Sequence, residues 1–181
     1  MNLKHHFLLP MPSLSGDYFA NSLTYICEHS DEGAMGLMVN RPSDVSLLEL
    51  MAQIGLKTNR RLIETPVLEG GPVSTERGFV LHSDDKTYES SANLGNTLSL
   101  STALEVLDAI ARDAGPQRYL VTLGYAGWAA GQLEAEIKNN VWLTTEADPD
   151  VLFNAPYENR LNAVAAAMGI DLSLIARPGN A

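Results

Sequence analysis

The order of strand-like and helix-like segments constrains the fold of this chain more than its composition does. Residues 22–29 and 34–40 carry β-forming side chains on both faces, and the turn residues 30–33 between them predict a hairpin. Helical patterns follow without a regular alternation of strand and helix. Such an order is typical of α+β proteins, so we expect a mixed sheet with flanking helices and not a doubly wound parallel sheet.

The helical patterns have recognisable start and stop signals. Ser46 and Glu49 have the spacing of a capping box, and Gly55 follows as a stop signal. Thr102 and Glu105 repeat that spacing before a second amphipathic segment. Residues 84–96 are polar and indicate an exposed excursion. We expect helices over residues 46–54, 102–114, 129–138 and 157–168, and further strands over residues 67–73, 77–83, 118–123 and 140–145.

The length of 181 residues suits one domain, which we expect to span residues 1–181. No apolar run approaches the ~20 residues that a membrane-spanning helix needs. Near the start, Pro10 and Pro12 interrupt a brief apolar patch, whereas a secretory signal needs a longer one. These features predict a cytoplasmic protein that does not enter the membrane.

The charge balance argues against direct contact with nucleic acid. Twelve basic residues oppose 22 acidic ones, which gives a formal net charge of −10. Apart from the pair Arg60 and Arg61, the sequence has no cluster of basic residues of the kind that nucleic-acid-binding proteins carry. The overall field would repel DNA, RNA and anionic membranes. Direct binding to nucleic acid is therefore disfavoured.

The segment GYAGWAAGQLEAEI, residues 124–137, has the context of a phosphate loop: an apolar strand, closely spaced glycines and a helix. The spacing of Gly124, Gly127 and Gly131 matches neither the dinucleotide fingerprint nor the P-loop, and no Lys-Ser/Thr pair follows. A hydrolase elbow needs serine where this chain has Ala126. We therefore interpret the segment as a structural turn and expect no cofactor there.

The only cysteine, Cys27, excludes an intramolecular disulfide and a multi-cysteine zinc site. In a strand, Cys27 and His29 would share a face, and an imidazolium beside a thiol favours a reactive thiolate. A lone cytoplasmic cysteine is more often a small buried apolar residue. Burial is the favoured interpretation, and a redox-sensitive thiol is the alternative.

The tripeptide His-Ser-Asp occurs twice, at residues 29–31 and 82–84. Three consecutive side chains diverge and cannot form a catalytic triad. Two copies brought together could bind a metal ion, but the ligand set is thin for a dedicated site. Ser-Asp is also ordinary turn chemistry at the end of a strand, which we favour, so we expect no metal.

A third candidate is an anion site that combines Arg41 with the Gly70-Gly71 turn. A guanidinium facing backbone amide groups could hold a carboxylate or a phosphate. The alternative is an arginine that caps a turn or pairs with one of the many acidic residues. Tyr125 and Trp128 could line such a pocket, although large aromatic residues more often belong to the core.

The chain as a whole resembles the AlgH/YqgE family of bacterial proteins. The stretches that carry the resemblance run from residue 11 to residue 171 in order, and include MPSLSGDYFANSLTYICEHSDEGAMGLMVNRP, VLEGGPV, GFVLHS, LGYAGWAAGQLEAEIKNNVWL and LFNAPYENR. The resemblance implies a cytosolic single α+β domain whose bifurcated mixed sheet curls into a pseudo-barrel flanked by helices. It also implies a regulatory association with alginate production and a transcriptional-regulator label, and it brings no accepted enzymatic activity or cofactor.

These observations favour a cytosolic regulatory protein that binds an unidentified protein or small molecule and acts at most indirectly on transcription. No catalytic set is evident, which favours a non-enzymatic role. The alternatives are a thiol-based redox protein that uses Cys27 with His29, and a direct nucleic-acid binder. The oligomeric state is left open. The expected ligand site is a surface cleft built from Arg41, Gly70, Gly71, His82, Tyr125 and Trp128, with Cys27 and His29 as redox candidates.

Overall fold

The computed structural model describes residues 1–14, 16–58, 65–102 and 104–172. Backbone contacts divide the chain into two compact units. Unit 1 comprises residues 1–41 and 126–181, and unit 2 comprises residues 42–125. In the parts of the chain described, no helix has both the length and the apolar character needed to cross a bilayer. The pair Arg60-Arg61 lies outside the described residues.

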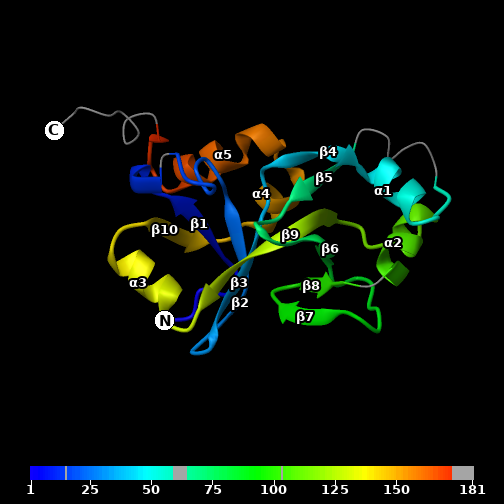
Figure 1. The fold of residues 1–181 in the computed structure, drawn as a ribbon, viewed down its shortest axis with the longest axis horizontal. Coiled ribbons are helices and arrows are strands. Elements are labelled where there is room, and N and C mark those ends of the chain that lie inside the picture. Colours follow the sequence, from blue (N-terminus) through cyan, green and yellow to red (C-terminus); the bar gives the residue numbers. More distant parts are fainter. Residues whose placement is uncertain (15, 59–64, 103, 173–181) are drawn as a thin grey trace. The chain divides into compact units, whose positions relative to one another are not determined.

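Unit 1 contains an antiparallel sheet whose strand order is β10-β1-β2-β3-β9 (Figure 1). The strands β2 and β3 form the hairpin predicted from the sequence, with a bulge between Ile26 and Glu28. The end of β9 pairs with β3 from Gly36↔Ala126 to Gly33↔Ala129. The strands are β1 (His6–Pro10), β2 (Thr24–Ser30), β3 (Gly33–Met38), β9 (Tyr119–Ala129) and β10 (Trp142–Glu146).

The helices of unit 1 are shorter than the sequence pattern predicted. The segment expected to be helical from residue 129 remains in β9 through Ala129, and α3 (Gln132–Lys138) begins only after a turn. The pattern over 157–168 becomes a 3-10 helix, η3 (Tyr157–Asn159), followed by α5 (Arg160–Ala167). The remaining helical elements of unit 1 are η1 (Pro12–Leu14) and α4 (Pro149–Asn154).

Arg160 lies at the start of α5 with only 2% of its surface exposed. Its Nη1 donates to the carbonyl of Val39 at 2.6 Å, and its Nε donates to the carbonyl of Ala155 at 2.9 Å. The guanidinium also lies 4.4 Å from the centre of the Tyr157 ring. Because a buried cation is costly without such partners, these contacts fix α5 to the chain segment that follows β3.

Unit 2 contains a mixed sheet. Four of its strands pair antiparallel, in the order β9-β6-β8-β7. The strand β5 pairs with β9 in parallel, and β4 pairs with β5. The predicted α+β class is confirmed. Residues 84–96 are mostly exposed, as expected, and they include the short strand β7. The elements are β4 (Pro42–Ser46), α1 (Leu47–Gln53), β5 (Pro66–Glu69), β6 (Val73–Ser83), β7 (Ala92–Gly95), β8 (Leu98–Ser101) and α2 (Leu104–Ala111).

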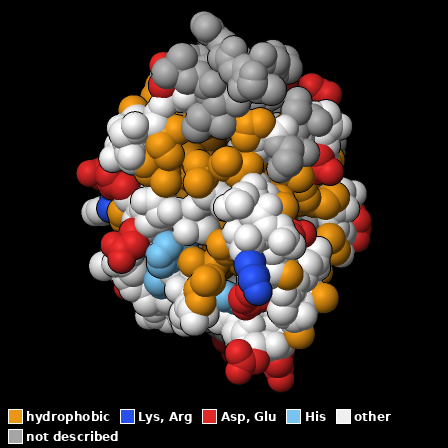
Figure 2. Space-filling model, turned by 90° about the vertical axis from the view of Figure 1, so that its left-hand side faces the viewer, with side chains coloured by type: hydrophobic (Ala, Val, Ile, Leu, Met, Phe, Trp, Pro, Cys, Tyr) orange, Lys and Arg blue, Asp and Glu red, His pale blue; other side chains and the backbone are white. Residues whose placement is uncertain are grey.

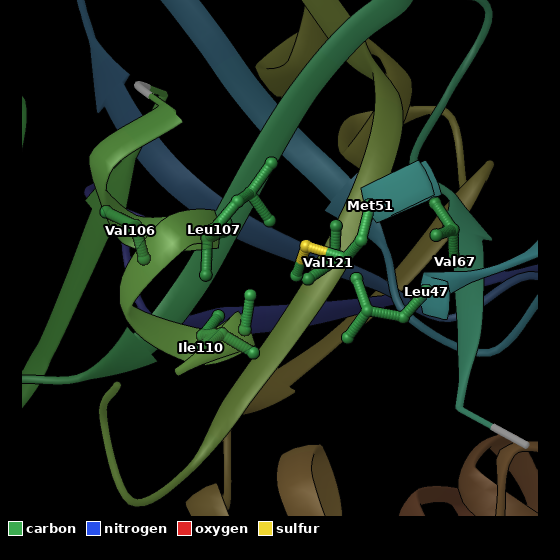
Figure 3. Packing of buried hydrophobic residues seen from close by; sticks show 9 residues of the cluster. Leu47, Met51, Val67, Val106, Leu107, Ile110 and Val121 are labelled. Carbon is green, nitrogen blue, oxygen red and sulfur yellow. The ribbon is translucent and has the colours of Figure 1, made fainter. Parts of the chain in front are cut away.

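The core of unit 2 forms where α1 and α2 pack on the sheet (Figure 3). Ser46 caps α1 as predicted, since its Oγ accepts a hydrogen bond from the Glu49 amide at 3.1 Å. Full burial of each large apolar side chain contributes about 1.5–3 kcal/mol. The buried members of the cluster are Leu47, Met51, Val67, Val80, Val106, Leu107, Ile110, Ala111 and Val121.

Replacement of Met51 by alanine is expected to lower the free energy of unfolding by about 2–5 kcal/mol, because it leaves a cavity among these side chains. Ile54 at the end of the same helix is 36% exposed and serves as the matched control. Its replacement by alanine should cost well under half as much. Urea denaturation of both variants measures the difference, and equal losses would contradict the position of this core.

Candidate functional site

The glycine segment forms the end of β9 and the turn into α3. Gly131 adopts a left-handed backbone with φ 77°. The side-chain oxygen of Gln132 accepts a hydrogen bond from the Ala129 amide at 2.9 Å, so the turn is closed by its own residues. The turn is confined to residues 130–131, whereas Gly124 and Gly127 lie within β9, so the segment is structural but only its end is a turn.

Trp128 belongs to a cluster held by the carboxylate of Glu136. The indole N–H groups of Trp128 and Trp142 both donate to Oε2 of Glu136, at 2.8 and 2.9 Å. Gln132 donates to Oε1 at 3.2 Å, and the ring of Phe19 stacks on Trp128. Trp128 is 7% exposed. The candidate pocket residue Trp128 therefore lies in the core of unit 1, where it fixes α3 to the sheet.

His29 links the N-terminal segment, β2 and α3. The Leu3 amide donates to Nδ1 of His29 at 2.8 Å, so the proton of the neutral ring lies on Nε2. Nε2 in turn lies 2.5 Å from a carboxylate oxygen of Glu134. The pKa of Glu134 is lowered by a hydrogen bond from its own backbone amide and by the bond from His29. Both ring nitrogens of His29 are thus engaged, and neither is free to activate a thiol.

Cys27 is fully buried, and burial raises the pKa of its thiol well above the ordinary value. Its sulfur lies 4.0 Å from the carbonyl of Tyr25. A reactive thiolate requires access and a lowered pKa. The geometry disfavours the redox interpretation of Cys27 and His29, and it agrees with the interpretation of Cys27 as a buried apolar residue.

Cys27 is expected to be silent toward iodoacetamide in the native protein and to react once the chain is unfolded in denaturant. Burial and the raised pKa both suppress the thiolate that alkylation requires. The measurement is mass spectrometry of the protein after timed exposure in buffer and in urea. Fast alkylation of the folded protein would restore the redox alternative.

His82 is fully buried in unit 2 and lies in a chain of hydrogen bonds. Its Nδ1 donates to the Ser83 carbonyl at 2.7 Å, so Nε2 accepts from the hydroxyl of Ser101 at 2.7 Å. The Ser91 hydroxyl lies 2.7 Å from that of Ser101, and the ring of Tyr88 meets His82 edge-on. Burial lowers the pKa of His82 below its ordinary value. A neutral His82 therefore ties β6 to β8 and to the residue that precedes β7.

Lowering the pH from about 7.5 to about 5.5 should reduce the free energy of unfolding through His82. Its pKa in the folded protein lies below the ~6.5 of an unfolded histidine, so the unfolded chain takes up the proton first. The contribution is fully present above ~6.5 and is lost as the pH falls toward the folded pKa. Urea denaturation at both pH values should show a smaller drop for His82→Gln than for the unchanged chain. An equal drop would assign the acid sensitivity to other groups.

The two halves of the predicted anion cleft lie in different units. Arg41, in unit 1, donates to the Ala20 carbonyl at 3.1 Å and lies 5.1 Å from the centre of the Tyr18 ring. Gly70 and Gly71, in unit 2, pack against Gly124. A Cβ at Gly70 would lie 2.3 Å from the Gly124 carbonyl, and one at Gly124 would lie 2.4 Å from the Gly71 carbonyl. The glycines thus allow close backbone packing, and a cleft that combines them with Arg41 stays a prediction.

The remaining candidates have local contacts as well. Tyr125 is half-buried, and its ring meets Phe79 edge-on at 5.7 Å between centres. Among the described residues, no group of three or more histidine, cysteine, aspartate and glutamate side chains is placed to hold a metal ion. On the face drawn in Figure 2, histidine and hydrophobic side chains reach the surface, and acidic side chains are more prominent than basic ones.

A hollow that sequence reasoning missed lies in unit 2, between α1 and α2. We call it the α1–α2 groove. Its volume is about 170 Å³. One wall is formed by Leu50 of α1 and by Ile54 just after it, and the other by Leu104 and Leu107 of α2. Its floor comes from β6 and β9, and its polar lining residues are Glu76 and Thr102; the floor residues are Gly78, Phe79, Val80, Val121 and Leu123.

One signal in the sequence could have indicated this groove. Leu104 lies outside the apolar stripe of the predicted helix and is 60% exposed in the structure. Ile54, just after α1, is 36% exposed. Single exposed apolar residues are common, but two of them on opposite walls of one hollow form a surface suited to an apolar partner.

Comparison with known proteins gives a consistent result over nearly the whole chain. A family model described as AlgH-like matches residues 7–173. A UPF0301 protein of Pseudomonas paraeruginosa is 50% identical over 182 residues, which cover 99% of this chain and 96% of that protein. The UPF0301 protein AlgH of Pseudomonas aeruginosa is 49% identical over 182 residues, with the same coverage of both chains.

Solved structures agree with this similarity. The solution structure of AlgH from Pseudomonas aeruginosa matches with a TM-score of 0.83 and 48% identity, covering 100% of this chain and 97% of that chain. A crystal structure of a protein from Corynebacterium diphtheriae matches with a TM-score of 0.75 at 22% identity, over 97% of this chain and 92% of that one. The second likeness concerns the fold alone.

Proposed function

Because the chain belongs to the AlgH-like family, we propose that it is a regulatory protein that works by binding a ligand, and that the α1–α2 groove of unit 2 is the binding site. Any effect on transcription is then indirect, passing through the ligand or another protein. The net charge of −10 opposes direct contact with DNA. The protein acts in the cytoplasm and needs no catalytic group for this role.

The observation that carries this proposal is Gly78 on the floor of the groove. Glycine within a strand is unfavourable because it packs nothing and loses much conformational freedom on folding. Gly78 lies in register with Leu123 and does not have a left-handed backbone. A Cβ at this position would meet its nearest neighbours at 3.9 Å, an ordinary contact distance. Neither backbone geometry nor crowding requires glycine here, and its effect is to keep the floor of the hollow open.

The irregular pairing of β6 with β9 is another possible explanation for a glycine at position 78. It does not explain Gly78, for the following reason. The pairing with β9 is irregular between Val73 and Gly78, and glycine is common at bulges. At a bulge, glycine is needed where the backbone is left-handed, and in this stretch the residue with positive φ is Ser74 at 47°. Gly78 pairs with Leu123 at the end of the irregular stretch and its backbone is not left-handed, so the bulge does not by itself require glycine at this position.

The proposal is tested by filling the groove from its floor. Gly78→Val should leave the free energy of unfolding within about 1 kcal/mol and abolish binding in the groove, because the added side chain points into the hollow. Benzyl alcohol is a suitable neutral probe, titrated at millimolar concentration while the methyl signals of Leu104, Leu107 and Ile54 are followed by NMR. In the unchanged protein these signals should shift and saturate.

The control for this variant is Thr75→Val on the same strand. Thr75 is exposed and does not line the groove, so this variant should bind the probe normally. Absence of any saturable shift in the unchanged protein would refute the groove as a binding site. Unaltered binding to a folded Gly78→Val variant would place the probe elsewhere.

A further inference from the structure

We propose that the ligand of the α1–α2 groove is a small organic cation: a single ring or compact branched chain that carries an ammonium or guanidinium group. This inference rests on the proposed function and adds the chemical class of the ligand. In it, the apolar part fills the hollow between α1 and α2, and the positive charge lies beside the carboxylate of Glu76.

The size of the hollow limits the apolar part. At about 170 Å³ it is smaller than the ~300–1,000 Å³ of pockets that hold drug-sized ligands or cofactors. An apolar protein cavity of ~150 Å³ is known to take up benzene. The groove therefore accommodates one ring or a branched chain of similar volume. Nucleotides and larger cofactors exceed that volume.

Glu76 sets the charge of the ligand. It is the one charged residue among the groove-lining residues described, and its side chain is exposed. Within the described part of the chain, no hydrogen bond or ion pair ties its carboxylate to another residue. An exposed carboxylate at an apolar hollow attracts a cation and repels an anion. The hydroxyl of Thr102 is a second polar group that could accept a hydrogen bond from an ammonium ion.

Acidic residues lie on both helices that wall the groove. Glu105 on α2 accepts hydrogen bonds from the amide and hydroxyl of Ser90. The next carboxylate on α2, Asp108, pairs with Arg112 at 2.8 Å. Glu49 on α1 is exposed. Asp108 is thus neutralised by Arg112, and Glu49 and Glu105 add negative charge to the two helices, which favours a cationic ligand.

Arg77 is the cation nearest to Glu76 in the chain. Its guanidinium lies 5.2 Å from the centre of the Phe79 ring. This contact holds the charge of Arg77 over an aromatic face, and guanidinium groups are commonly stabilised in this way. Arg77 thus has a partner, and Glu76 remains the acceptor for the charge of the ligand.

Three probes of nearly equal shape separate charge from apolar fit: benzylamine, benzyl alcohol and benzoate. Each is titrated into the full chain at neutral pH and low salt, with the groove methyl signals followed by NMR. Benzylamine should bind about threefold to fivefold more tightly than benzyl alcohol, the upper part of the range expected for a partly exposed ion pair. Benzoate should bind more weakly than both, and the preference should shrink when salt is added.

Glu76→Gln removes the charge and keeps the shape. It should reduce the preference for benzylamine to about one while binding of benzyl alcohol persists. Glu89→Gln is the matched control, because Glu89 is exposed in the same unit and does not line the groove. This control should keep the preference, apart from a small uniform effect of net charge.

The outcomes separate this inference from the proposed function. Equal binding of benzylamine and benzyl alcohol, or tighter binding of benzoate, would overturn the cation inference and leave the groove standing as an apolar site. If the preference for benzylamine persists in Glu76→Gln, the cation inference is also overturned, because a residue other than Glu76 then recognises the positive charge. If none of the three probes gives a saturable shift, the proposed function itself is overturned.

Discussion

The strand β9 pairs with strands of both units. The change of pairing partners along β9 limits which residues can occupy the positions near that change. Its first part pairs with β5 and β6 in unit 2, and its last residues pair with β3 in unit 1. Gly124 lies close to the point where the partners change. Its backbone is left-handed with φ 78°, and it is crowded by the carbonyl of Gly71. A side chain there would be strained by conformation and by contact together, so the glycine of the GYAGW stretch is a requirement of strand pairing.

The rest of that stretch serves unit 1, which explains why it resembles a phosphate loop without being one. A phosphate loop presents free amides at the start of a helix, whereas here the Glu134 amide in the first turn of α3 donates to its own carboxylate. The first turn of α3 carries Glu134, which binds His29, and the next turn carries Glu136, which binds two indole groups. Two carboxylates used as structural acceptors make the start of this helix unfavourable for an anion.

Periodicity and capping residues were enough to predict the elements whose form is decided locally. The β2–β3 hairpin and α1 with its Ser46 cap follow from neighbours in sequence, and both were predicted from it. The β7 strand and the buried Arg160 were not predicted, because each depends on partners distant in sequence: β7 on its pairing with β8, and Arg160 on the carbonyl of Val39. Propensity describes a residue's own preference, and tertiary pairing overrides it at such positions.

The candidate residues chosen for their chemistry illustrate the same limit. The types of Cys27, His29 and His82 suggested reactivity, but reactivity depends on exposure and on which ring nitrogen is free, and a sequence states neither. The structure surrounds each of the three with partners or with apolar side chains. Residue type gave the possible chemistry, and burial decided that these groups act as packing and hydrogen-bonding residues.

The α1–α2 groove differs from these candidates, because its distinguishing residue, Gly78, has no side chain. Motif searches look for groups that donate, accept or react, and Gly78 does none of these. Its significance appears only when the strand on which it lies, the ordinary backbone geometry and the empty space above it are known together. A strand position that could carry a larger apolar side chain, and so gain packing energy, carries none. In a domain of marginal stability, that omission is intelligible if the space is filled by something other than the chain itself.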